Sequence, residues 1–182
     1  MTKAKVIEDL RKHSANGLFY TWLGDGYAWY LNGYAAYRDA EPLPSFDYDV
    51  EQKIKDPQAI FKEADEGRLK RVEIDKDILK AFIKSHRRNA ITSYRERFKI
   101  NYKGSLIAVN PWLLQDMCEY VKDYAIYINE DWNGYPDISY REPLWGFSTD
   151  FLSIQCLTLP VSVTPEDSAK WCVENADMEV SE

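Results

Sequence analysis

Two pairs of carboxylates have the spacing at which acidic side chains can share a divalent metal ion. They are Asp47 with Asp49 and Asp75 with Asp77, and Mg²⁺ held in this way supports nuclease chemistry. Asp49, however, falls in a proline-flanked loop, and Asp75 directly precedes a helical pattern, where an aspartate is better explained as the N-terminal cap. We therefore expect no metal site and no bound cofactor, and a metal-dependent nuclease is only a third alternative.

The other residue types used in catalysis form no known arrangement. The two histidines, His13 and His86, cannot be placed beside a serine or cysteine from the sequence, and His86 is better explained by packing. Residues 24–26 (Gly-Asp-Gly) lack the Lys-Ser/Thr and the helix of a phosphate-binding loop. The cysteines are far apart and without a CxxC pair, so we expect buried free thiols and no structural zinc at Cys118, Cys156 and Cys172. We expect a protein that is not an enzyme.

A basic segment stands out in an acidic chain. Residues 68–103 contain twelve Lys/Arg and four Asp/Glu, a net of +8, whereas the whole chain carries −7. At about 100° per residue, the helix predicted over 76–88 has an apolar arc of Ile78, Leu79, Phe82 and Ile83. The opposite arc is basic. It consists of Lys76, Lys80, Lys84, Arg87 and Arg88, and the basic segment continues to Arg95 and Arg97.

Three interpretations of this charge pattern remain open. The basic arc is simply solvated, or it binds phosphates, because clustered Lys/Arg is the electrostatic footprint of nucleic-acid contact. In the third, the acidic remainder of the chain contacts a basic protein groove that normally holds nucleic acid. The acidic residues concentrate in 39–67, with nine Asp/Glu and three Lys/Arg, and this segment is either a solvated loop or a partner-binding arm with Asp47, Asp49 and Glu51.

The elements that position these groups follow from the hydrophobic pattern. We expect helices at 3–13, 76–88, 110–122 and about 165–175, a hairpin within 95–109, and strands at 18–23, 27–31, 34–38, 69–74, 124–128, 138–140 and 151–161. The aromatic side chains of the first three strands are either a base-stacking platform or half-buried strand residues. They are Tyr20, Trp22, Tyr27, Trp29, Tyr30, Tyr34 and Tyr37.

These elements predict an α+β fold, in which residues 72–88 and 110–122 form two helices that pack side by side on one face of an antiparallel sheet. The predicted organisation is an N-terminal helix (1–17), an α+β domain (18–163) containing the acidic loop 39–67, and a C-terminal helix with an acidic tail (164–182). No run approaches the about 20 apolar residues of a membrane span. The charged N-terminus lacks the apolar core of a signal peptide, so we expect a cytoplasmic protein with no membrane partner.

Four segments resemble a domain of the bacterial replicative sliding clamp, the DNA polymerase III beta subunit. They are 32–37 (Asn-Gly-Tyr-Ala-Ala-Tyr), 72–80 (Val-Glu-Ile-Asp-Lys-Asp-Ile-Leu-Lys), 109–114 (Val-Asn-Pro-Trp-Leu-Leu) and 157–161 (Leu-Thr-Leu-Pro-Val). Asn32 stands where clamps have an acidic residue, the following His-Arg pair of the clamp motif is missing, and a ring needs six such domains. The resemblance implies that the helices face DNA through Lys76, Lys80, Lys84, Arg87 and Arg88.

In length and acidity the chain also resembles phage or mobile-element anti-CRISPR proteins of type II. That resemblance implies an inhibitor that binds a guide-loaded CRISPR effector nuclease in the cytoplasm of the host bacterial cell. The function expected is therefore non-catalytic binding, as an inhibitor of a nucleic-acid enzyme. The alternative is a clamp-like DNA-binding or replication accessory module, which would bind DNA or RNA directly.

Overall fold

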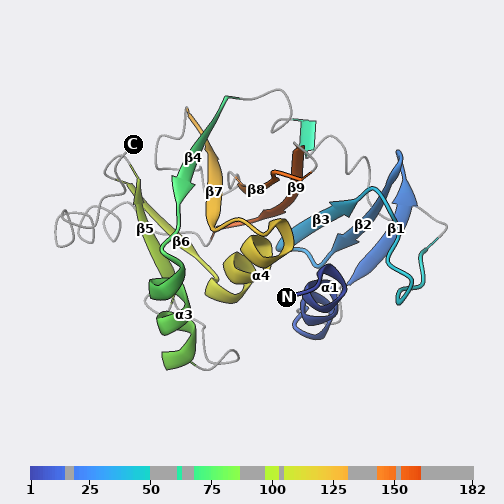
Figure 1. Ribbon diagram of the computed structural model, residues 1–182, viewed down its shortest axis with the longest axis horizontal. Helices are drawn as coiled ribbons and strands as arrows, with labels where there is room; N and C mark the ends of the chain where they lie inside the picture. Colours follow the sequence, from blue (N-terminus) through green and yellow to red (C-terminus); the bar gives the residue numbers. More distant parts are fainter. Residues whose placement is uncertain are drawn as a thin grey trace.

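The computed structural model of the chain describes residues 1–14, 19–49, 61–62, 68–86, 97–102, 105–130, 143–150 and 153–160. The predicted α+β class is confirmed, with helices and a large antiparallel sheet (Figure 1). The elements are α1 (Lys3–Lys12), β1 (Tyr20–Gly24), β2 (Tyr27–Leu31), β3 (Ala35–Asp39), β4 (Leu69–Glu73), α3 (Lys76–Ser85), β5 (Phe98–Tyr102), β6 (Ser105–Val109), α4 (Pro111–Val121), β7 (Ala125–Asn129), β8 (Leu144–Ser148) and β9 (Ser153–Thr158).

Seven strands form one sheet in the order β1-β2-β3-β9-β8-β7-β4, and each pair is antiparallel. β1 and β4 are therefore its two edges, and they lie at opposite ends of this sheet, with β5 and β6 beyond β4 (Figure 1). The hairpin β5–β6 is a separate two-stranded sheet. The tight turn between β1 and β2 uses Asp25 and Gly26 at φ 54° and 81°, which is the backbone that two-residue hairpin turns require.

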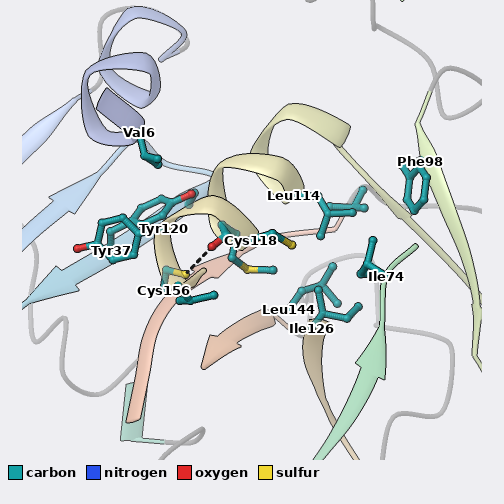
Figure 2. Packing of buried hydrophobic residues seen from close by; sticks show 14 of the residues in the cluster. Val6, Tyr37, Ile74, Phe98, Leu114, Cys118, Tyr120, Ile126, Leu144 and Cys156 are labelled. Atoms are coloured by element: carbon teal, nitrogen blue, oxygen red, sulfur yellow. Dashed lines mark hydrogen bonds between the residues drawn. The ribbon is translucent and has the colours of Figure 1, made fainter. Parts of the chain in front are cut away.

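The main core lies between one face of the sheet and the helices (Figures 1 and 2). α4 contacts β8 and β9, and α1 and α3 both contact α4. Asn110 begins α4, because its side chain accepts the backbone N–H of Trp112 at 3.0 Å, and Pro111 follows at a position where no N–H is needed. A Cβ on Gly146 of β8 would lie 2.9 Å from the Met117 side chain. Close packing of α4 on the sheet therefore requires glycine there.

The other face of the sheet carries a second, aromatic cluster. Phe61 is fully buried there, with its ring edge-on to Trp29 at 5.3 Å and to Trp145 at 5.7 Å. The Arg38 guanidinium lies 4.5 Å from the Phe61 ring, and its Nε donates to the Ile154 carbonyl at 2.8 Å. Because Trp29 is fully buried, this ring is a core residue and gives no support to a base-stacking platform.

The structure corrects the sequence prediction at several elements. β8 was not predicted, and residues 72–73 belong to β4, so the helix after them begins only at Lys76. α3 lies beside α4. It also contacts the hairpin, because the Phe82 ring lies against the ring of Phe98 in β5. The strand expected at 138–140 and the helix expected at 165–175 lie outside the described residues.

Candidate nucleic-acid interface

The basic helix α3 is fixed at both ends by local hydrogen bonds. The Asp75 carboxylate accepts the backbone N–H groups of Asp77 and Ile78, both at 2.9 Å, as predicted for an N-cap. The helix ends at Ser85, earlier than the predicted Arg88, and the His86 N–H donates to the Ile83 carbonyl at 3.3 Å. This leaves Arg87 and Arg88, and also Arg95, outside the described residues.

The apolar side of α3 is narrower than predicted. Leu79 is fully buried, and Phe82 and Ile83 are half-buried against the main core. Ile78 is 55% exposed, so its placement on the buried arc was wrong. Successive helical residues are rotated by about 100° around the helix axis. Ile78 therefore points about 100° away from the buried Leu79, past the edge of the surface that α3 packs against.

The end of α3 gives His86 a packing role. Its imidazole ring stacks on the Phe82 ring at 4.1 Å with an interplanar angle of 15°. Its Nδ1 lies 2.7 Å from the Phe82 carbonyl oxygen, at donor distance. The side chain therefore closes the last turn of the helix, in agreement with the expectation that it packs.

Three lysines of α3 form an exposed row, which we call the lysine stripe: Lys76, Lys80 and Lys84. Their four-residue spacing brings them onto neighbouring turns, with a rise of about 6 Å from each to the next. The stripe lies beside the buried side of the helix, and its first two members lean towards the start of β7. The Lys76 and Lys80 ammonium groups lie 4.8 and 5.9 Å from the centre of the Tyr124 ring. Such cation–π contacts favour one position for a side chain that is otherwise free.

Tyr124 is itself held in place by α4. Its hydroxyl donates to Glu119 at 2.5 Å. This hydrogen bond is the main reason why the pKa of Glu119 lies below its usual value, and Lys80 adds a smaller electrostatic contribution. Burial raises the pKa of the Tyr124 hydroxyl, and its bond to Glu119 raises it further. The Tyr124 hydroxyl therefore stays protonated at neutral pH and keeps its hydrogen bond to Glu119. The ring that Lys76 and Lys80 contact is thus held in place at this pH.

Lys84 and the arginines near the stripe differ in whether their charge is exposed and in whether it is paired with a carboxylate. Lys84 forms no ion pair with any residue that the structure describes. Arg71 of β4 is instead neutralised, because it pairs with Glu73 and with Asp123 at 3.0 Å. Arg97 is half-buried just before β5. The described part of the basic segment therefore presents its exposed charge mainly through α3.

The acidic residues named from the sequence lie at the other edge of the sheet. The Asp49 N–H donates to the Thr21 carbonyl at 3.0 Å, and the Thr21 hydroxyl donates to the Asp47 carbonyl at 2.5 Å. The side chains of Asp47 and Asp49 are exposed. This part of the predicted acidic arm is thus fixed along β1, and Glu51 lies outside the described residues.

The arrangement offers no metal site that we can identify. Within the described ranges, no group of three His, Cys, Asp or Glu side chains is placed to hold a metal ion. Asp75 uses its carboxylate as a helix cap. Of the helices that the structure describes, none combines the length and the apolar character needed to cross a membrane.

Comparisons of the chain with protein families, with curated proteins and with solved structures find no match. The sliding-clamp and anti-CRISPR resemblances therefore stay predictions. The structure adds two residues that the sequence did not single out, Tyr124 and Glu119. A glutamate and a tyrosine five residues apart occur in many sequences, so this spacing does not predict a functional pair. Their connection to the lysine stripe is seen only in the structure, where α3 contacts α4.

Proposed function

We propose that the protein is a non-catalytic nucleic-acid-binding protein whose lysine stripe contacts backbone phosphates. The observation that carries this proposal is the row of Lys76, Lys80 and Lys84 on a capped helix, with two ammonium groups placed over Tyr124. Holding long side chains in one region lowers the conformational entropy that binding removes. Phosphate contacts by Lys supply most of the sequence-independent affinity for nucleic acid. A clamp-like replication accessory module is one form that such a protein would take.

The exposed acidic groups support a second function, inhibition of a nucleic-acid enzyme. The backbone of Asp47 and Asp49 is held along β1 by hydrogen bonds with Thr21, and both side chains are exposed, so this edge of the sheet presents an anionic surface. An anionic surface complements the cationic groove of an enzyme that normally holds nucleic acid. The partner we propose under this function is a guide-loaded type II CRISPR effector nuclease, met in the bacterial cytoplasm.

Salt-dependent binding tests the proposed function directly. The wild-type chain is titrated into fluorescein-labelled duplex DNA, single-stranded DNA and RNA at several salt concentrations, and binding is followed by anisotropy. Each phosphate contact contributes about 0.9 to the slope of log K against log salt for duplex DNA. Lys80→Gln with Lys84→Gln should therefore lower the slope by about 1.8. The matched control is Arg11→Gln with Lys12→Gln, which removes two exposed charges from α1 and should leave the slope unchanged.

The same variants separate the two functions in a cleavage assay with a guide-loaded effector nuclease. If the acidic surface inhibits, Asp47→Asn with Asp49→Asn should weaken inhibition, while the double lysine variant should keep it. If the folded double lysine variant binds every nucleic acid as the wild type does and inhibition is also unchanged, the stripe is a solvated face and the proposal fails.

A further inference from the structure

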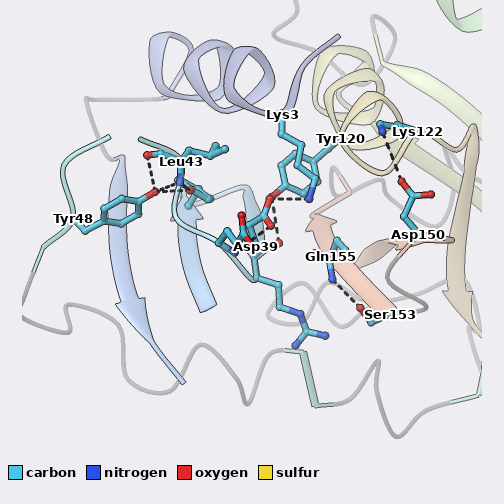
Figure 3. A network of polar contacts seen from close by, with 12 residues as sticks. Lys3, Asp39, Leu43, Tyr48, Tyr120, Lys122, Asp150, Ser153 and Gln155 are labelled. Carbon is cyan, nitrogen blue, oxygen red and sulfur yellow. Dashed lines mark hydrogen bonds and ion pairs between the residues drawn. The ribbon is translucent and has the colours of Figure 1, made fainter. Parts of the chain in front are cut away.

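A groove of about 580 Å³ lies on the helical side of the molecule. Its walls are the start of α1, the end of α4, and the segment 41–44 that follows β3. Ser148 at the end of β8 and Asp150 beyond it also line the groove, and Figure 3 shows Lys3 beside Asp39 and Lys122 beside Asp150. The volume is within the range of about 300–1,000 Å³ that ligand sites usually have. The apolar part of its lining is contributed by Pro42, Leu43, Pro44, Tyr120 and Val121.

Three ion pairs line this groove, and each cation has its own carboxylate. The pairs are Lys3 with Asp39 at 2.7 Å, the Met1 ammonium with Glu119 at 2.9 Å, and Lys122 with Asp150 at 3.7 Å. The first pair is also fixed by the Tyr120 hydroxyl, which donates to Asp39 at 3.2 Å. These ion pairs connect the walls of the groove. Because each cationic group of its lining is already paired with a carboxylate, the groove is poorly suited to bind an anion.

A fourth carboxylate and a hydroxyl remain. Glu41 is exposed at the groove and forms no ion pair with any described residue. Ser148 is only 4% exposed, lines the groove, and its hydroxyl makes no hydrogen bond within the described part of the chain. The residues that line the groove therefore carry one more carboxylate than cationic groups, and the Ser148 hydroxyl is a further hydrogen-bonding group in the lining.

We propose that this groove binds one basic side chain, arginine or lysine, from a peptide segment of a partner protein. The aliphatic stem of such a side chain suits the surface of Pro42, Leu43 and Val121, as long cationic side chains commonly pack their stems on apolar atoms. Its charge complements Glu41, and its N–H groups or the adjoining peptide backbone satisfy Ser148. The groove shares Glu119 with the support of Tyr124 beside the lysine stripe, but the proposed ligand uses Glu41 and Ser148, and the proposal does not depend on nucleic-acid binding.

Short peptides test the site on the 182-residue chain with the Met1 amino group unmodified, because the Met1 ammonium lines the groove. The probes are acetyl-Gly-Arg-Gly-amide, its lysine counterpart, and the citrulline peptide, which has the shape of arginine without its charge. Binding is followed by ¹⁵N–¹H correlation spectra of assigned protein. We expect saturable shifts at residues 41–44, 120–122 and 148 with the arginine or lysine peptide, and weaker shifts with citrulline.

Two variants and a control locate the interaction. Glu41→Gln should weaken binding of the charged peptide about 1.5- to 5-fold, the range for one exposed ion pair, and should leave the citrulline peptide unaffected. Ser148→Ala should weaken both peptides. Asp77→Asn, which removes an exposed carboxylate of α3 outside the groove, should change neither.

Four results would overturn the proposal. The first three are the absence of saturable shifts at the groove, equal binding of the arginine and citrulline peptides, and equal losses from Glu41→Gln and Asp77→Asn. The fourth is saturation by free arginine with no added affinity from the peptide, which would refute a protein partner. Spectra of each variant, recorded before titration, establish that the chain is folded, so a loss of binding is not confused with unfolding.

Discussion

Two adjacent leucines of α4 allow a sharp test of the core. Leu114 is fully buried between the helix and the sheet, whereas Leu113 is only half-buried at the margin of the same cluster. Both substitutions to alanine delete the same atoms and change helix propensity equally. Removing Leu114 also leaves a cavity, so Leu114→Ala should lower the free energy of unfolding by about 3–5 kcal/mol. For Leu113→Ala only part of the transfer free energy is lost, about 1–2 kcal/mol.

The assay is urea unfolding followed by far-UV circular dichroism, with the thermal midpoint as a second measurement. For a chain of this size, about 3–5 kcal/mol corresponds to a fall of about 6–20 °C in Tm. An unchanged denaturant slope would show that both variants unfold from the same compact state. If Leu113→Ala proves as costly as Leu114→Ala, the packing of α4 on β8 and β9 described above is wrong.

Three further predictions follow from single contacts. Phe82→Ala should cost about 2–3 kcal/mol, less than the about 3–5 kcal/mol for a fully buried aromatic ring, because Phe82 is only half-buried; a loss below about 0.5 kcal/mol would mark it as a surface residue. Burial raises the pKa of Cys118 to about 12 and raises that of Cys156 too, so a thiol reagent at pH 8 should label both positions only on unfolding, as peptide mapping would reveal. The lowered pKa of Glu119 stabilises the fold above the unfolded value of about 4.3, and this contribution is lost as the pH falls through the folded pKa. Tyr124→Phe removes the main cause, so its stability should fall less steeply than that of the wild type between about pH 5 and pH 3; identical pH profiles would contradict this.

Local rules recovered the parts of the fold that depend on short-range interactions. Asp75 was expected as a cap, and a helix was expected from residue 110; Asp75 and Asn110 both accept backbone N–H groups at helix starts. Strands were expected at 18–23 and 27–31, and the short turn between them has the positive φ at Asp25 and Gly26 that a tight hairpin turn needs. These features could be predicted because each one depends on residues fewer than five positions apart.

What the sequence did not predict depends on contacts between distant segments. β8 reads Leu-Trp-Gly-Phe-Ser and is buried on both faces, so it lacks the alternation by which half-buried strands are recognised. Ile78 is exposed because the elements that pack on α3 do not extend over this side chain. The helical pattern of α3 alone does not show how far its neighbours extend. The same holds for Tyr124, whose ring meets the lysine stripe only because α3 contacts α4.

The strand order also sets the distance between the lysine stripe and the exposed side chains of Asp47 and Asp49. From β1, beside Asp47 and Asp49, to β4, which leads into the lysine stripe, the sheet contains six inter-strand steps. At about 4.8 Å each, these steps separate the two edges by about 29 Å. That separation is several times the Debye length of about 8 Å at physiological salt, so each group responds to its own surroundings. A polyanion bound at the lysine stripe should therefore repel Asp47 and Asp49 only weakly, and the β1 edge can meet a second, cationic surface at the same time.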